Sequence, residues 1–234
     1  MSSHICFCCN KMVDKFRYFN NRDNAQCPHC GSLERHRLFS IYLDKQKAHY
    51  EKVLHVAPEK CIIPTLKAVT STYICADINP SRYNWATDII YADLTALPFT
   101  NEFDMIIASH ILEHIPDDLS AMANLYKALK PGGLLLAMIP QKLSVATTYE
   151  DSTIVTPAER LKHFGQHDHV RWYGSDFTQR LKSVGFYIKV YYTERLTSSV
   201  DRMYYDEKHM IASISESTSY GTHGGDLIYE CVKL

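Results

Sequence analysis

The chain has 234 residues, 46% of them apolar, and a formal net charge of −1 at pH 7. This length suits one α/β domain of ordinary size with a short additional module. There is no run of about 18 consecutive apolar residues, and the first ten residues lack the charged-then-apolar layout of a secretory signal. We therefore expect a cytoplasmic protein without a membrane partner.

Basic residues are concentrated near the N-terminus. Residues 1–52 hold nine Lys/Arg against five Asp/Glu, and the rest of the chain carries the opposite imbalance. The surplus is small, and thiolates bound to a metal ion would cancel part of it. These counts argue against a nucleic-acid partner.

Five of the eight cysteines lie in the first thirty residues, a pattern that indicates metal binding instead of disulfides. Cys8, His4 and His29 are weaker candidate ligands. We predict a structural zinc ribbon over residues 1–31, with iron as the alternative that has the same ligand spacing. Four cysteines form two Cys-x-x-Cys pairs that can surround one Zn²⁺: Cys6, Cys9, Cys27 and Cys30.

Ser32 is placed to cap a helix over residues 33–48, within a linking segment at 32–50. From residue 51 onward, short apolar runs alternate with helical stretches, which is typical of βαβ units. We therefore predict a seven-stranded, mostly parallel sheet in residues 51–234. Its strands are expected at 53–56, 73–76, 89–91, 103–108, 134–139, 186–192 and 227–232.

Two packing helices are predicted at 118–129 and 175–184 from their apolar stripe and flanking residues. Lys-Pro-Gly-Gly at 130–133 ends the first of them. Residues 140–172 are polar, rich in His and longer than a normal connection. They predict a lid over the site, with a short helix near 157–164.

Carboxylates follow two neighbouring predicted strands. Asp77 ends the second strand, where it can accept both hydroxyls of a ribose, and Asp93 follows the third, close to where an adenine amino group could donate. The turn at 55–59 follows the first strand, at the switch point where open α/β sheets bind ligands. This order suits adenosine binding.

The chain resembles the class I methyltransferases through ADINP, ADLTALPF, FDMIIASHILEHI and LKPGGLLL. CPHCGSLERHR, VLHVAPEKC, TYED and FGQHDHVRWYG further resemble a bacterial type 11-like group with an N-terminal zinc ribbon, up to about residue 190. The resemblance implies a Rossmann-like α/β fold and S-adenosylmethionine as the cofactor.

The resemblance also implies which positions bind that cofactor. The turn at 55–59 lies beside the methionine part, and its usual glycines are replaced here by Ala57, Glu59 and Cys61. The Glu59 side chain is then a candidate to hold the cofactor's ammonium group. The cofactor positions are His55, Ala57, Pro58, Glu59, Asp77, Ile78, Asp93, Leu94 and Ser109.

The segment from Gln166 to Tyr173 is the predicted acceptor site. His167 or His169 is a candidate general base, Asp168 would orient its neighbour, and Arg171 would pair with a phosphate or carboxylate on the acceptor. Adjacent residues point to opposite sides of an extended stretch, so only part of this set can face the site. A second metal on the His-x-His pair is an alternative.

His110 and His114 compete for the role of base, and we favour His110 because it is closer to the strand end. We predict an O- or N-methyltransferase acting on a small polar, or anionic, metabolite. The resemblance implies a surface-saccharide precursor or its substituent. The alternatives are an RNA-modifying methyltransferase that uses the ribbon to contact RNA, and a non-catalytic binding protein of the same fold. Oligomeric state and residues 193–225 are left unassigned.

Overall fold

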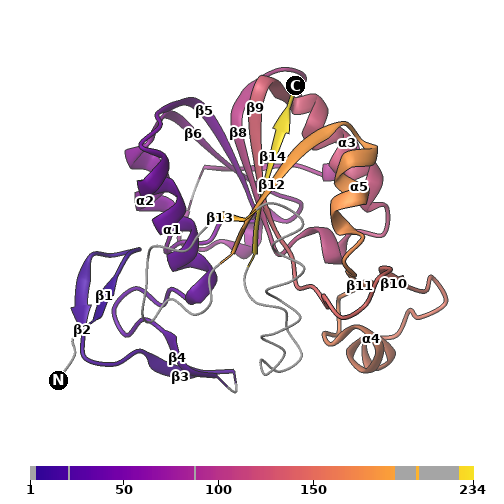
Figure 1. The fold of residues 1–234 in the computed structure, drawn as a ribbon, viewed down its shortest axis with the longest axis horizontal. Coiled ribbons are helices and arrows are strands. Elements are labelled where there is room, and N and C mark those ends of the chain that lie inside the picture. Colours follow the sequence, from indigo (N-terminus) through magenta and orange to yellow (C-terminus); the bar gives the residue numbers. More distant parts are fainter. Residues whose placement is uncertain (1–3, 21, 87, 193–203, 206–226) are drawn as a thin grey trace.

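The computed structural model describes residues 4–20, 22–86, 88–192, 204–205 and 227–234, and its centre is one sheet (Figure 1). All seven predicted strands are present, and a two-residue strand adds an eighth at one edge. The strands are β5 (Tyr50–Val56), β6 (Thr70–Asp77), β7 (Ile89–Tyr91), β8 (Phe103–Ser109), β9 (Leu129–Met138), β12 (Phe186–Tyr192), β13 (Tyr204–Tyr205) and β14 (Leu227–Lys233).

The strands lie in the order β13-β12-β14-β9-β8-β5-β6-β7. β5 pairs in parallel with both β6 and β8, and β9 continues the parallel set, whereas β14 runs antiparallel to β9 and β12. The chain therefore builds outward from one side of β5 and then returns to build from its other side. Ligands of open α/β sheets bind at such a reversal, beyond the carboxyl ends of the strands.

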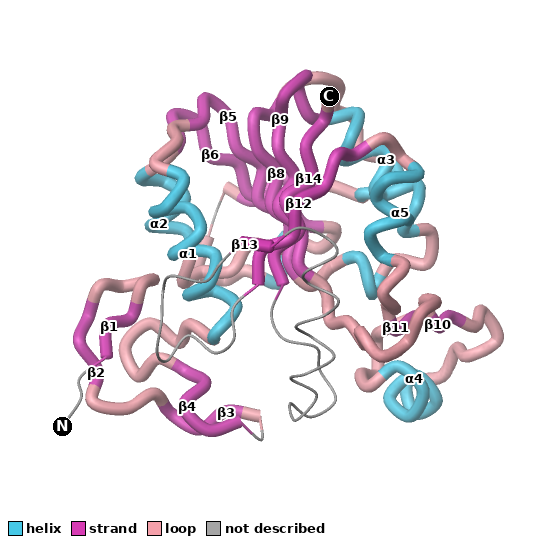
Figure 2. The backbone as a smooth tube through the Cα atoms, in the orientation of Figure 1, coloured by secondary structure: helices cyan, strands magenta, loops and turns pink. Residues whose placement is uncertain are grey.

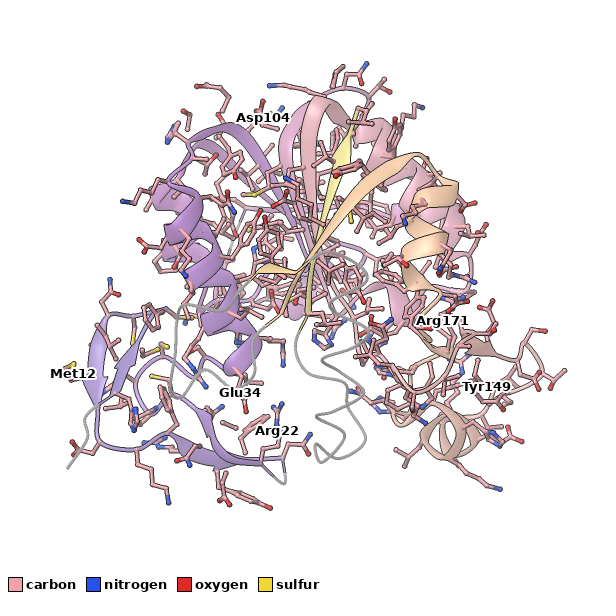
Figure 3. All side chains as sticks on the ribbon, in the orientation of Figure 1. Met12, Arg22, Glu34, Asp104, Tyr149 and Arg171 are labelled. Carbon is pink, nitrogen blue, oxygen red and sulfur yellow. The ribbon has the colours of Figure 1, made fainter. Side chains whose placement is uncertain are left out.

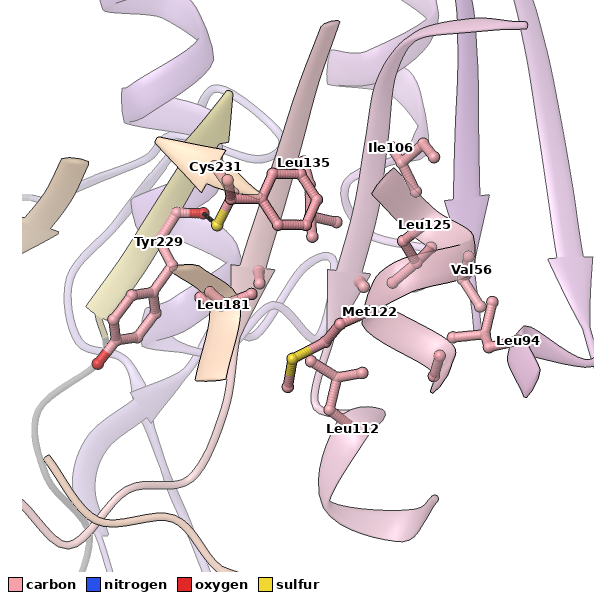
Figure 4. Packing of buried hydrophobic residues seen from close by; sticks show 14 of the residues in the cluster. Val56, Leu94, Ile106, Leu112, Met122, Leu125, Leu135, Leu181, Tyr229 and Cys231 are labelled. Carbon is pink, nitrogen blue, oxygen red and sulfur yellow. Dashed lines mark hydrogen bonds between the residues drawn. The ribbon is translucent and has the colours of Figure 1, made fainter. Parts of the chain in front are cut away.

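Helices cover both faces of the sheet (Figure 2). Met122 and Leu125 pack among Val56 and Ile106 of the strands (Figure 4). β8 is buried along almost its whole length because both of its faces are covered, which is why its sequence is a nearly continuous apolar run. No helix in the described ranges has the length and apolar composition needed to cross a membrane. One face carries α1 (Glu34–Gln46) and α2 (Ile63–Ala68), and the other carries α3 (Asp118–Ala128) and α5 (Phe177–Ser183).

The N-terminal residues form two small hairpins that dock on α1. Val13 and Phe16 are buried in the same cluster as Phe39 of α1, so the hairpins share a core with one face of the sheet. Arg22 also pairs with Glu34 at the start of the helix, with 3.4 Å between Nη2 and Oε2 (Figure 3). The hairpins pair β1 (His4–Cys6) with β2 (Lys11–Val13), and β3 (Arg17–Phe19) with β4 (Arg22–Gln26).

Ser32 does not cap α1 as predicted. The N-cap residue is Leu33, whose backbone N–H donates to Nδ1 of His36 at 2.9 Å. The Ser32 hydroxyl instead lies 3.3 Å from Sγ of Cys6 and 3.2 Å from Sγ of Cys30. The Ser32 hydroxyl therefore contacts the cysteine cluster instead of capping the helix.

Residues 140–172 form an excursion beside the carboxyl ends of the parallel strands, on the opposite side of the molecule from the N-terminal hairpins (Figure 1). Its helix lies at the predicted position and begins with a capping box between Thr156 and Glu159. Gly165 ends this helix with a φ of 81°. The excursion contains β10 (Tyr149–Glu150), α4 (Pro157–Phe164) and β11 (Arg171–Trp172).

Gly165→Ala is expected to destabilise this excursion by roughly 2–3 kcal/mol, from the left-handed backbone and from overpacking. A Cβ at position 165 would lie 2.5 Å from Cζ2 of Trp172. Gly132→Ala is the matched control, because Gly132 has a similar φ of 75° but nothing within 4 Å of an added Cβ. Urea denaturation measures both, and an equal loss of unfolding free energy in the two variants would contradict the packing of Trp172 on this turn.

Candidate active site

The predicted cofactor positions lie along one edge of the sheet, where the parallel strands end around the switch point. Ala57 and Glu59 follow β5, Asp77 ends β6, Asp93 follows β7, and Ser109 ends β8. Because parallel strands all end at the same edge, the fold gathers positions that are far apart in the sequence.

Ala57 stands in the turn where the class I pattern has a glycine. Its φ is 48°, in the left-handed region, which costs a non-glycine residue about 1–2 kcal/mol. Its N–H donates to the carbonyl of Ala76 at 2.8 Å and ties the turn to β6, and Pro58 beside it is buried. The backbone thus keeps the conformation that a glycine would adopt freely, although the glycine is missing.

Glu59 is the centre of a polar cluster at this edge. Its Oε1 accepts a hydrogen bond from Oγ of Ser109 at 2.9 Å. Nε2 of His36 lies 3.3 Å from Oε1, and Nε2 of His55 lies 3.3 Å from Oε2. Burial raises the pKa of the Glu59 carboxyl, but the two nearby histidines outweigh burial and hold this pKa well below its ordinary value. Glu59 is therefore a carboxylate at neutral pH.

Two of the predicted cofactor side chains point into the protein instead of toward the edge. His55 is fully buried, with Nδ1 2.7 Å from the Tyr73 hydroxyl, and its other nitrogen faces Glu59. The Leu94 side chain is buried in the hydrophobic core. His55 is thus placed to hold Glu59 in position, while Ile78 is 60% exposed at the edge itself.

The two aspartates at the strand ends are ordered by short hydrogen bonds. Asp77 is buried, and it accepts from the Asn79 N–H at 2.7 Å and from the Tyr83 hydroxyl at 2.6 Å. Oδ1 of Asp93 accepts from both the N–H and the hydroxyl of Thr95, each at 2.8 Å. These carboxylates are positioned acceptors for hydroxyl or amino donors, as the adenosine prediction requires.

The predicted acceptor segment is divided between solvent and interior. The side chains of His167 and Asp168 are 73% and 51% exposed, whereas His169 is buried. Nδ1 of His114, from the neighbouring 3₁₀ turn η3 (Leu112–His114), lies 3.4 Å from Oδ2 of Asp168. Of the two predicted bases here, His169 contacts the segment after β8, since its ring centroid lies 4.7 Å from that of His114.

Arg171 is not placed to bind an anionic acceptor, which corrects the role predicted for it. It is 2% exposed, and its Nε donates to Oε2 of Glu150 at 2.8 Å. Its terminal nitrogens donate to the carbonyls of Leu112, Ile115 and Pro116 at 3.0, 2.6 and 2.8 Å. Arg171 therefore joins the excursion to the turn after β8 (Figure 3).

His110 follows β8 with a φ of 53°, a left-handed conformation that a residue of this size adopts at a cost. Its Nδ1 lies 3.4 Å from Oε1 of Glu113, which is buried and which the sequence did not single out. The available signal was the spacing of His110, Glu113 and His114, because residues three and four apart meet on one side of a helical turn.

The four predicted zinc ligands come together, since their Sγ atoms lie within 4.8 Å of one another. Cys6 is 3.7 Å from Cys30, and Cys9 is 3.9 Å from Cys27, sulfur to sulfur, with all of them free thiols. This donor set fits a tetrahedral zinc ion. Cys8 is outside the group, and its sulfur accepts from Oγ of Ser40 at 3.3 Å.

Comparison with known proteins agrees with the fold. Residues 61–137 match the model of a family described as a methyltransferase domain. No curated protein gave a significant match. A SAM-dependent methyltransferase from Archaeoglobus fulgidus superimposes with a TM-score of 0.55 at 14% identity, over 85% of this chain and 94% of that one.

Two further solved structures are similar. A chain from the complex between the Haloferax volcanii Trm112 methyltransferase activator and a methyltransferase gives a TM-score of 0.56 at 13% identity, over 86% of this chain and 90% of that one. The cyclase SpnF gives 0.57 at 15% identity, over 94% of this chain and 88% of that one. At these identities the likeness concerns the fold, and fold alone does not fix the reaction.

Cys27→Ser is expected to abolish retention of the ribbon metal, which is about one ion per chain, and to lower the melting temperature, because metal binding supplies folding energy to small modules. Cys8→Ser is the matched control and should retain the metal. Elemental analysis after dialysis measures both and separates zinc from iron. Retention by Cys27→Ser, or loss by Cys8→Ser, would show that the ligand set is wrong.

Proposed function

We propose that this chain, which carries the methyltransferase domain of the class I S-adenosylmethionine-dependent enzymes, methylates an oxygen or nitrogen atom of a small polar acceptor. The observation that carries the proposal is the pair of ordered carboxylates, Glu59 and Asp77, at neighbouring strand ends of the switch point. A carboxylate beyond each strand suits a ligand that presents an ammonium group at one end and a ribose at the other.

The residues at the edge divide the cofactor between them. Asp77 would accept the ribose hydroxyls, and Asp93 would accept from the adenine amino group. Glu59, ionised and held by His55 and Ser109, would bind the ammonium of the methionine part. S-adenosylmethionine, when bound, supplies an electrophilic methyl group on a sulfonium.

The acceptor side needs little more than alignment and, for a hydroxyl, loss of a proton. His110 and His169 lie on that side of the edge, after β8 and before β11. Because Arg171 is fully engaged inside the protein, nothing at this position favours an anionic acceptor. We therefore take a hydroxylated metabolite, such as a saccharide precursor, as the acceptor class.

The ribbon takes a structural role in this proposal. Four thiolates fill the coordination shell of zinc and leave no position for a substrate. The non-catalytic alternative was based on the missing glycines. Ala57 argues against it, because the turn keeps the left-handed conformation without a glycine.

Calorimetric titration with S-adenosylmethionine and S-adenosylhomocysteine tests the cofactor site. Asp77→Ala is expected to weaken binding about tenfold or more, because two charge-assisted hydrogen bonds to the ribose are lost. Each such bond contributes up to about 3 kcal/mol. Asp104→Ala is the control. Asp104 is a strand aspartate that binds Lys130 at the opposite, amino end of β8, and its loss should leave the affinity unchanged.

Saturable binding by the intact protein that Asp77→Ala removes and Asp104→Ala preserves would support the proposal. If folded, metal-loaded protein binds neither ligand, the proposal is refuted. If the two variants bind the cofactor equally well, Asp77 is not part of the cofactor site.

A further inference from the structure

We infer that Glu113, His114 and His169 form a second metal site, which binds a divalent transition-metal ion and presents a hydroxyl of the acceptor to the transferred methyl group. The inference rests on the proposed function for the second of these roles only. It differs from the His-x-His site considered from the sequence, because His167 is exposed and is not among the residues gathered here.

The three side chains come from two segments that are joined at this point. Glu113 and His114 lie in the turn η3 just after β8, and His169 lies in the excursion. The N–H of Val170 donates to the carbonyl of Glu113 at 2.9 Å, and the two imidazole rings are 4.7 Å apart between centroids. One ligand atom from each residue lies within 4.8 Å of the others.

Within the described parts of the chain, the Glu113 carboxylate lacks a hydrogen-bond partner that would compensate its burial. It is 1% exposed, and neither carboxylate oxygen has a hydrogen-bond partner among the described residues. Nδ1 of His110 lies 3.4 Å from Oε1, and Nε2 of His114 lies 4.0 Å from the same oxygen. A buried carboxylate without a hydrogen bond is destabilising, and a bound cation would offset that destabilisation.

Both histidines are oriented as metal ligands are. Nδ1 of His169 lies 3.2 Å from the carbonyl oxygen of Phe164, and because a carbonyl only accepts, Nδ1 carries the proton and Nε2 keeps its lone pair. Nδ1 of His114 faces the Asp168 carboxylate at 3.4 Å, which leaves its Nε2 on the side of Glu113. Metal-bound histidines usually donate their second N–H to a carbonyl or carboxylate in this way.

The surroundings keep the three ligands in place. Arg171 holds the backbone on both sides of η3 through the carbonyls of Leu112 and Ile115. An ion bonded at about 2.1 Å to each ligand atom spans at most about 4.2 Å, so small side-chain rotations would complete the site.

The donor set indicates the kind of ion and its use. Two imidazoles and one carboxylate suit zinc, iron, cobalt or nickel better than magnesium or calcium, and three protein ligands leave open positions. A hydroxyl bound there loses its proton to solvent more readily. Its oxygen then forms the bond to the methyl carbon as the carbon–sulfur bond breaks, the electron pair stays on sulfur, and the products are a methyl ether and S-adenosylhomocysteine.

The test uses full-length protein whose ribbon is loaded with Zn²⁺, titrated with Co²⁺ and followed by visible absorption. We expect about one Co²⁺ per chain with d–d bands and without a thiolate-to-cobalt charge-transfer band, because zinc binds the thiolates more tightly than cobalt does. Glu113→Gln and His169→Ala should each weaken Co²⁺ binding about tenfold or more. His167→Ala, which changes an exposed histidine two residues away, should not.

Glu113→Gln keeps the inference testable if His169→Ala fails to fold, because it removes a buried charge at nearly constant volume and should melt no lower than wild type without metal. Wild type that binds no Co²⁺ beyond the ribbon would overturn the site, and so would His167→Ala weakening Co²⁺ as much as Glu113→Gln does. S-adenosylmethionine titrated into the same samples separates the two proposals: cofactor binding without Co²⁺ binding refutes only the metal site, and Co²⁺ binding without cofactor binding refutes only the proposed function.

Discussion

β5 pairs with β6 on one side and β8 on the other, and the positions of the functional side chains follow from this double pairing. Because the chain reverses its direction of winding at β5, the segments that follow β5 and β8 separate toward opposite faces, and the strand ends between them are left open. Glu59, Asp77 and Ser109 occupy that opening because each lies at or just beyond the carboxyl end of its strand.

The half-buried carboxylate of Glu59 connects the N-terminal module to this edge. His36 and Arg35 of α1 approach it from one side, and Ser109 approaches from the end of β8. Burial lowers the pKa of His36, but the nearby Cys61 and Glu59 outweigh burial and raise this pKa overall. The helix that follows the ribbon therefore places the guanidinium of Arg35 and the imidazole of His36 beside the proposed cofactor turn.

Local sequence patterns were sufficient to predict the strands and the four helices, because an apolar run or stripe involves only residues that are close in the sequence. α2 was missed because its six residues carry a proline and only one buried side chain, Leu66. Ser32 and Arg171 were misassigned for a tertiary reason. The Ser32 hydroxyl contacts the cysteine cluster, and the Arg171 guanidinium donates to three carbonyls of a turn that is distant in the sequence. The spacing of residues in the sequence predicts neither contact.

The excursion contributes to the site through its buried side. Arg171 and His169 turn inward to the segment after β8, while His167 and Asp168 remain exposed. Since one structural neighbour of this fold is named as a cyclase, the sheet does not by itself specify the chemistry. In this chain the excursion meets η3 at a carboxylate and two imidazoles, so the groups proposed to bind the second metal ion come from beyond the strand ends and not from the sheet itself.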